Sequence, residues 1–177
     1  MTVRVAKTED FDEVWRLFLF AYEENAILPL SERKAVWHIK RALEPEKIHP
    51  TDTGMRGVIG VIGDPDLLEA AVFLTIGSYW YTEHLHIEEY VLLVDPRHRK
   101  SNHAKTLINW MEQQVKEVNL PLVTGILSNH RTEAKCRLYG RLLPKAGEFF
   151  VVKPEDVTMR PTLVLSSSIE QIVNRRH

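Results

Sequence analysis

The sequence predicts a mixed α/β fold, in which strands and helices alternate along a chain of 177 residues. The segment Val91–Leu107 supports this prediction most strongly. It begins with the apolar run Val91–Val94, stops at Pro96, crosses a polar and mostly basic turn, and continues as a helix from about Ala104. Proline lacks a backbone N–H and ends strand pairing, whereas the apolar residues after the turn recur at helical spacing. A strand that runs through a turn into a helix is typical of an α/β sheet.

Two helices are expected before residue 45. The apolar residues of the first helix recur at helical spacing, and they are Phe11, Val14, Trp15, Phe18 and Tyr22. Thr8 or Asp10 can cap the start of this helix, and Pro29 ends it. The second helix begins at Ser31 and carries a thinner apolar stripe, formed by Val36, Ile39 and Leu43. Each helix is therefore expected to pack one face on a sheet.

The strands of that sheet follow from apolar runs bounded by turn residues. A short strand is expected at residues 3–6, and Asp64-Pro65-Asp66 is a turn signal between strands at 57–62 and 68–76. A long central strand is expected at 84–94, and helices follow at about 104–118 and 133–142. The strand at 122–127 is expected to lie parallel to the long strand through a right-handed crossover. Two closing strands are expected at 148–152 and 157–165.

Composition limits the classes of function. With 44% hydrophobic residues the chain can bury one good core, so we expect a single domain over residues 1–177. Lys and Arg number 23 against 24 Asp and Glu, a net charge of −1, which creates no overall field that would attract nucleic acid. The single cysteine, Cys136, excludes an intramolecular disulfide, and no apolar run approaches the ~20 residues of a membrane span. We therefore expect a cytoplasmic protein.

The turn between the long strand and its helix has the form of an anion site. Its residues Arg97–His103 are polar and mostly basic. A helix N-terminus leaves backbone N–H groups without partners and carries a partial positive charge, so a turn at this position can hold a phosphate group. The same basic residues also occur in ordinary solvated turns, but the strand-turn-helix context favours the anion site.

Residues Arg99–Ala104 resemble the coenzyme A diphosphate loop of the GCN5-related N-acetyltransferases, in which Gln or Arg is followed by two residues, Gly, one residue, and Gly or Ala. The first and last of these positions match, and Asn102 stands where glycine is usual. Asn tolerates left-handed backbone angles, so the turn is expected to survive the change. Leu92–Pro96 resembles the family's approach to the loop, and Thr132–Gly140 is similar to its late Leu-Tyr helix. The resemblance covers roughly residues 3–152, and the loop also looks like that of phage and prophage members.

The resemblance implies a particular fold and co-substrate. The fold is a mostly antiparallel sheet flanked by helices, in which the long strand and the strand at 122–127 are parallel and diverge to leave a slot. Coenzyme pantetheine would lie in this slot and pair with the free backbone edge of the long strand at Leu92 and Val94, as an added strand does. Acetyl-coenzyme A would be the co-substrate, and its diphosphate would face the turn residues Arg99, Lys100, Ser101, Asn102, His103, Ala104 and Lys105.

Glu88 and Tyr139 are the expected catalytic residues. An acceptor amine must lose a proton during attack, which calls for a base that is ionised near neutral pH. Glu88 and Glu89 point to opposite faces of the strand, and Glu88 has the offset from Arg99 at which some histone-directed family members place a glutamate base. Tyr139 matches the tyrosine that the family places beside the coenzyme sulfur, where a phenol can protonate a thiolate. The alternatives are that both carboxylates only decorate the end of a sheet and that Tyr139 is a core aromatic.

No metal site and no thiol chemistry are expected. His84 and His86 share a strand face with Glu88, but two histidines and one carboxylate on a single strand rarely form a closed metal site. Cys136 lies in mid-helix without a clear base partner, which favours a buried thiol over a nucleophile. The aromatic turn Ser78–Thr82 either walls an acceptor pocket or packs against the first helices.

The resemblance thus predicts an acyl-coenzyme A dependent N-acyltransferase, most simply an acetyltransferase that transfers the acyl group directly from thioester to primary amine. Two other classes stay open. One is a coenzyme-binding module without turnover, because Asn102 replaces glycine; the other is a nucleic-acid binder that uses the basic turn Arg97–Lys105 with Arg175 and Arg176. The acceptor is a small-molecule or peptide amine, and a homodimer is a candidate assembly because dimers are common among the proteins that the chain resembles.

Overall fold

The computed structural model describes residues 2–44, 56–148 and 150. The strands in these ranges are β1 (Arg4–Val5), β2 (Arg56–Asp64), β3 (Leu67–Gly77), β4 (His86–Val94) and β5 (Leu122–Val123). The α-helices are α1 (Phe11–Asn25), α2 (Glu32–Leu43), α3 (His103–Val118) and α4 (Thr132–Leu142). Two 3-10 turns, η1 (Thr8–Asp10) and η2 (Pro96–His98), precede α1 and follow β4. No helix among the described residues is long and apolar enough to cross a bilayer.

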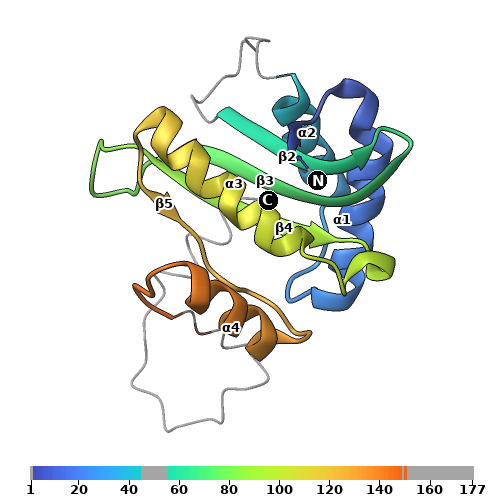
Figure 1. The fold of residues 1–177 in the computed structure, drawn as a ribbon. Coiled ribbons are helices and arrows are strands. Elements are labelled where there is room, and N and C mark those ends of the chain that lie inside the picture. The colour runs from blue at the N-terminus through green and yellow to red at the C-terminus, as the bar shows by residue number, and fades with distance from the viewer. Residues whose placement is uncertain (1, 45–55, 149, 151–177) are drawn as a thin grey trace, which may run out of the picture. The chain divides into compact units, whose positions relative to one another are not determined.

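The strands form one five-stranded sheet with the order β1-β2-β3-β4-β5 (Figure 1). Neighbouring strands are antiparallel, except that β5 runs parallel to β4. The helices α1 and α2 cover one face of the sheet and α3 covers the other. This arrangement confirms the predicted mixed α/β fold with one parallel pair.

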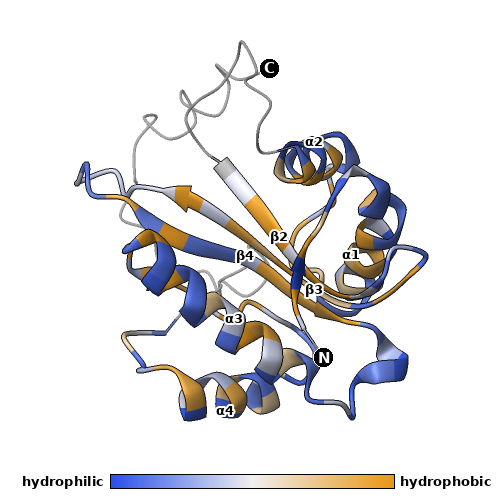
Figure 2. Cartoon of the chain, turned by 45° about the horizontal axis from the view of Figure 1, so that its top comes forward, coloured by the Kyte–Doolittle hydropathy of each residue, from blue (hydrophilic) through white to orange (hydrophobic). Residues whose placement is uncertain are grey.

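Buried apolar residues form two clusters, one on each face of the sheet. Figure 2 shows hydrophobic residues along the strands and on parts of the helices that cover them. On one face Val14 and Leu17 of α1 join Ile39 of α2 against the strands. On the other face Leu107 and Met111 of α3 pack against the same strands. Residues 70–75 of β3 contribute to both clusters and are all buried, as expected for a strand that is covered on both faces.

The predicted elements are present in the described ranges, with two differences. β5 contains only two residues of the strand expected at 122–127, because the chain leaves the sheet after Val123. Cys136 is exposed on α4, so the expectation of a buried thiol is wrong. The strand expected at 157–165 and most of that expected at 148–152 lie outside the described residues. The described helices and strands all belong to one compact unit, Met1–Gly147, and Glu148–His177 forms a separate unit. The single domain over residues 1–177 stays a prediction.

β4 carries one extra residue relative to β3. Val91 and Glu89 pair with neighbouring residues of β3, so Tyr90 between them has no partner of its own. Such a β-bulge bends the strand and interrupts the alternation of side chains between its two faces. The Tyr90 ring contacts Phe73, with 5.2 Å between ring centroids, on the face covered by α1 and α2. Glu89 points to the opposite face, which also carries Leu92.

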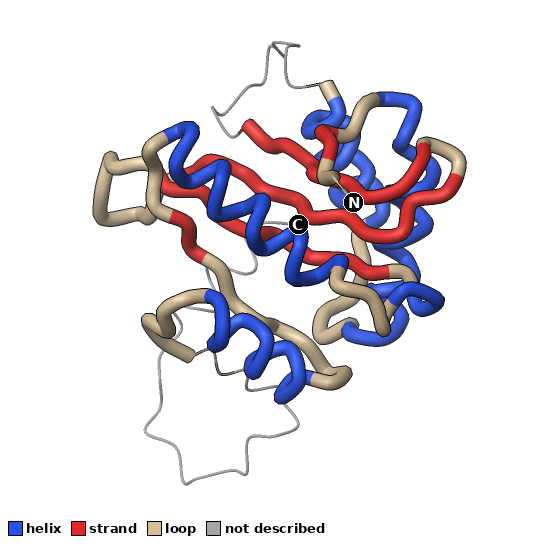
Figure 3. Tube along the Cα trace, in the orientation of Figure 1, coloured by secondary structure: helices blue, strands red, loops and turns tan. Residues whose placement is uncertain are grey.

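β4 and β5 separate after a short contact. They pair only at Ile87 with Leu122 and at Glu88 with Val123. The chain then leaves the sheet as a loop that leads to α4 (Figure 3). Within the described ranges, the backbone edge of residues 89–94 therefore has no strand partner on this side.

Asp95 fixes the chain where β4 ends. Its buried carboxylate accepts hydrogen bonds from the Arg97 backbone N–H at 2.8 Å, from the Arg97 guanidinium at 2.9 Å and from Arg16 Nη1 at 2.7 Å. Arg16 lies on α1, so this contact ties the turn after β4 to the first helix. Hydrogen bonds from Arg97, and then from Arg16, hold the pKa of Asp95 well below its ordinary value, although burial opposes them.

We expect Asp95→Asn to lower the free energy of unfolding by roughly 2 kcal/mol at neutral pH, because it removes the charge that faces two guanidinium groups. Because folding lowers the pKa of Asp95, its contribution is complete above the unfolded-state pKa of about 4 and is lost as the pH falls below that value. Urea unfolding at neutral and at acidic pH measures both effects. Asp66→Asn, in the exposed turn before β3, is the matched control. Equal losses in the two variants would contradict the anchoring role of Asp95.

Candidate active site

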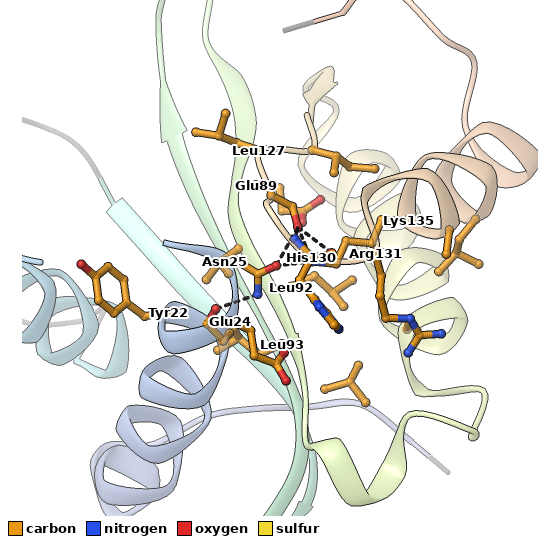
Figure 4. A pocket seen from close by; sticks show the side chains of 18 of the residues that line it. Tyr22, Glu24, Asn25, Glu89, Leu92, Leu93, Leu127, His130, Arg131 and Lys135 are labelled. Atoms are coloured by element: carbon orange, nitrogen blue, oxygen red, sulfur yellow. Dashed lines mark hydrogen bonds between the residues drawn. The ribbon is translucent and has the colours of Figure 1, made fainter. Parts of the chain in front are cut away.

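A cavity of about 510 Å³ lies along the free edge of β4. Residues 89–94 of β4 form one wall, and the loop 125–128 contributes another together with α4. The end of α1 and the residues after it, 24–28, line a further side. Figure 4 shows labelled side chains from all of these elements around one space.

Five of the residues predicted to bind the coenzyme line this cavity. They are Leu92, Val94, Arg99, Ser101 and Ala104. The two strand residues belong to the unpaired edge of β4, and Ala104 lies in the first turn of α3. The first N–H groups of a helix have no partner within the helix, so the turn offers donors to an anion at this end of the cavity. The structure brings the strand edge and the turn to one space, and coenzyme binding there stays a prediction.

The other four residues predicted for the turn do not line the cavity. Lys100 and Lys105 are exposed, and the His103 ring instead contacts Glu69 of β3. Asn102 is the N-cap of α3 with a φ of −89°, so this position does not need the left-handed angles that glycine favours. The replacement of glycine by Asn102 therefore introduces no backbone strain.

The arginines of the turn are paired with carboxylates. Arg97 donates to Asp95, and Arg99 donates to Glu24 at the end of α1. The hydrogen bond from Arg99 holds the pKa of Glu24 below its ordinary value. Paired guanidinium groups attract a phosphate backbone less than free ones, which disfavours the nucleic-acid interpretation. The two terminal arginines of that interpretation, at 175 and 176, lie outside the described residues.

Glu89, and not Glu88, faces the cavity. Glu89 accepts hydrogen bonds from the Tyr139 hydroxyl at 2.7 Å and from Thr124 Oγ1 at 2.5 Å. Glu88 is exposed and does not line the cavity. The prediction of Glu88 from the sequence rests on its offset relative to Arg99. The extra residue Tyr90 lies between these two residues and shifts the alternation of side chains by one position. The structure thus moves the candidate base from Glu88 to Glu89, and it leaves Tyr139 beside that base.

The surrounding residues shift the pKa values of both Glu89 and Tyr139. Burial raises the pKa of Glu89, while hydrogen bonds from Thr124 and Tyr139 oppose that rise. Burial, and then the charge of Glu89, raise the pKa of Tyr139 well above its ordinary value. Tyr139 is therefore a neutral hydrogen-bond donor. The pKa of Glu89 is shifted from its ordinary acidic value in the direction of neutral pH. Such a pair suits the movement of protons between reacting atoms in the cavity.

A further polar cluster, which the sequence analysis did not single out, joins α1 to α4. Lys135 Nζ donates hydrogen bonds to Asn25 Oδ1 and to Ser128 Oγ, both at 2.7 Å. Figure 4 shows Asn25 and Lys135 pointing toward one another. Burial lowers the pKa of Lys135. Lys135 precedes Tyr139 by four residues and so shares its helix face, and this spacing is the signal in the sequence that points to it.

Two other candidates from the sequence lie away from this cavity. Cys136 does not line it, so the structure gives no support to a nucleophilic thiol. The aromatic turn Ser78–Thr82 does not line it either, and Trp80 at its tip is 95% exposed. Tyr79 instead stacks on His86, with 4.6 Å between ring centroids. The aromatic turn therefore does not wall this cavity.

Several solved structures share the architecture of this chain. A ribosomal-protein-alanine N-acetyltransferase from Brucella melitensis biovar Abortus 2308 matches with a TM-score of 0.59 and 15% identity, over 86% of this chain and 99% of the other. An aminoglycoside antibiotic 6'-N-acetyltransferase from Acinetobacter haemolyticus matches with a TM-score of 0.60 and 14% identity, over 89% and 100%. The chain has the fold of the GCN5-related N-acetyltransferases.

The N-acetyltransferase fold is also present in a transcriptional regulator from Bacillus halodurans C-125, which matches with a TM-score of 0.58 and 16% identity, over 86% of this chain and 97% of the other. No protein-family model matches the sequence, and no curated protein matches it. The resemblance seen in the loop and the Leu-Tyr helix is thus confirmed at the level of the fold. A fold hosts more than one function, so the activity has to be argued from the site.

The contacts of Glu89 lead to a measurable expectation. The Tyr139 hydroxyl donates a hydrogen bond that lowers the pKa of Glu89, so Tyr139→Phe should raise that pKa further. Thr124→Val removes the other such bond and should act in the same direction. NMR titration of the Glu89 carboxyl carbon measures the change. Tyr22→Phe, which removes a hydroxyl that donates to the Leu28 carbonyl, is the control. A lower pKa in Tyr139→Phe would contradict the geometry described here.

Proposed function

We propose that this protein is an acyl-coenzyme A dependent N-acyltransferase, most simply an acetyltransferase in which an amine attacks the thioester directly. One observation carries the proposal: a free strand edge with different chemistry at its two ends. Residues 89–94 span about 17 Å. Glu89 and Tyr139 lie at the first end of this edge, and the turn before α3 follows its last residue, Val94. Acetyl-coenzyme A has a matching layout, with a thioester at one end, amides in the middle and a diphosphate beyond them.

The strand edge and the turn account for binding of the donor. The open N–H and C=O groups of Leu92 and Val94 suit the amides of pantetheine, which would add to β4 as a strand does. The N–H groups at the start of α3 suit the diphosphate, and each favourable charge at a helix terminus contributes about 0.3–1 kcal/mol. Basic side chains also line the cavity, and Arg131 among them can attract an anionic donor. The others are Arg99, which is paired with Glu24, His130 and Lys135.

Glu89 and Tyr139 account for the proton transfers. The amine nitrogen attacks the thioester carbonyl carbon and passes a proton to the Glu89 carboxylate. The carbon–sulfur bond breaks, and the departing thiolate takes the hydroxyl proton of Tyr139. Glu89 then returns its proton to Tyr139 through their 2.7 Å hydrogen bond, so both groups regain their starting state. The products are an amide and the free coenzyme thiol.

The proposed acceptor is a primary amine of a small molecule or peptide. Among the similar solved structures, one enzyme is named for a ribosomal-protein alanine and another for an aminoglycoside antibiotic. Both names denote acceptors with an amine group, and we extend only this chemical class to the present chain. Ile27 and Leu28 line the cavity from the α1 side, with Leu127 from the loop after β5, and would give the acceptor a partly apolar surface.

Binding of the donor is the first test. Acetyl-coenzyme A, coenzyme A and adenosine diphosphate should each raise the melting temperature, because all three carry the diphosphate. Ala104→Glu should weaken acetyl-coenzyme A binding at least tenfold, or about 1.4 kcal/mol, because it adds bulk and negative charge at the turn. Asn109→Glu, exposed on the same helix, is the matched control. Unchanged affinity in Ala104→Glu would exclude the turn as the diphosphate site, and no thermal shift with any ligand would exclude the transferase.

Turnover is the second test, measured as thiol release over a panel of amines. Glu89→Gln should lower kcat by about 100-fold, because a positioned base contributes on this order. Burial raises the pKa of Glu89, so the activity of the wild type should rise with pH through that raised value, and Glu89→Gln should lose this limb of the profile. Tyr139→Phe should lower kcat about tenfold with little change in the donor KM.

Glu88→Gln is the matched comparison for this experiment, because Glu88 neighbours Glu89 and is exposed. We expect its kcat to stay within about twofold of the wild type. A large loss in Glu88→Gln with normal turnover in Glu89→Gln would restore the assignment made from the sequence. Donor binding with thiol release at background over all amines would identify a coenzyme-binding module without turnover.

A further inference from the structure

Three side chains able to bind a metal converge beside the turn that precedes α3. Glu69 comes from β3, His98 from η2, and His103 is the first residue of α3. Glu69 Oε2 lies 2.5 Å from His103 Nε2 and 3.3 Å from His98 Nδ1. One ligand atom from each residue lies within 4.8 Å of the other two. Three elements thus bring two imidazole nitrogens and one carboxylate oxygen to one point.

This cluster is distinct from the cavity along β4. None of its three residues lines that cavity, and the proposed transfer does not use them. The side chains of His103, Glu69 and His98 are 6%, 18% and 31% exposed, so the cluster is largely shielded from water. The two imidazole rings stack with 5.7 Å between their centroids, which holds them in place. In the part of the chain that the structure describes, the imidazoles are the only basic groups paired with the Glu69 carboxylate.

We propose that Glu69, His98 and His103 bind a divalent first-row transition-metal ion, with Zn²⁺ as the first candidate. Imidazole nitrogen and carboxylate oxygen are ordinary ligands of such ions, and a water molecule can complete four-coordination. Ligand atoms at about 2.0–2.2 Å from a tetrahedral ion lie about 3.3–3.6 Å from one another. The 3.3 Å contact between His98 and Glu69 already falls at the lower end of this range. The contact between His103 and Glu69 needs to lengthen by about 0.8–1.1 Å, and the proton between them leaves to solvent.

A bound ion would connect both ends of the turn to the sheet. His98 and His103 flank residues 99–102, and Glu69 sits on β3 beside the end of β4, where the Asp95 N–H donates to the Glu69 carbonyl at 2.8 Å. One ion held by these residues would fix the separation of the two ends of the turn. The site is therefore a structural clamp for the segment that leads into α3.

Zinc binding to the metal-free full-length protein tests this proposal. Calorimetric titration with Zn²⁺ should give one ion per chain, and Co²⁺ should give the visible absorption of a four-coordinate site. His98→Ala and Glu69→Gln should each weaken Zn²⁺ binding at least tenfold. His98 is partly exposed, so its replacement should leave the fold intact, with a wild-type melting temperature in the presence of chelator. Zn²⁺ should then raise the melting temperature of the wild type and not that of His98→Ala.

His84→Ala is the matched control, because it removes an exposed histidine outside the cluster and should bind Zn²⁺ as the wild type does. Absence of saturable zinc binding would overturn the proposal, and so would equal affinity in the wild type and both cluster variants. Loss of binding in His84→Ala would also overturn it, by placing the ion at the histidine pair of β4 and the loop before it. The experiment uses the metal alone, so its outcome is independent of acyl transfer.

Discussion

The cavity depends on one inserted residue in β4. Where Tyr90 lacks a partner on β3 the strand bends, and it pairs with β5 at two positions only. The backbone edge of residues 89–94 is open because β5 ends at Val123, and the extra residue places Glu89 on the side on which α4 places Tyr139. An open strand edge presents a row of unpaired backbone N–H and C=O groups that can pair with another chain. In this protein α1 and α4 line the cavity along that edge. A ligand with its own amides suits this edge better than a side chain does.

Charge pairing holds the region around the turn together. Asp95 joins the end of β4 to α1 through Arg16, and Arg99 reaches α1 at Glu24. Lys135 makes a third link, from α4 to Asn25. Each link connects elements that are distant in the sequence, so the walls of the cavity are fixed by polar contacts as well as by the apolar clusters on the sheet. The same contacts occupy arginines that composition alone presents as a basic patch.

The fold limits the range of possible functions but does not identify one. Solved structures that share the fold at 14–16% identity include two acetyltransferases and a transcriptional regulator. Acyl transfer is proposed because Glu89 is half-buried and bonded to Tyr139, and because a helix N-terminus lies beyond the strand edge. These groups suit proton movement and electrostatic positioning of the reactants.

Local patterns in the sequence were enough to predict the order of strands and helices, the parallel pair, and the turn into α3, because apolar spacing and Pro96 act within a few residues of one another. The family resemblance, rather than these patterns, predicted that Leu92, Val94, Ala104 and Tyr139 share one site, and all four line the cavity. The tertiary structure alone decided that Glu89 rather than Glu88 faces the cavity, because strand register depends on the partner strand and one unpaired residue reverses the faces. It likewise decided which distant residues Lys135 and His103 contact, since the spacing of residues along one helix does not identify a partner on another element.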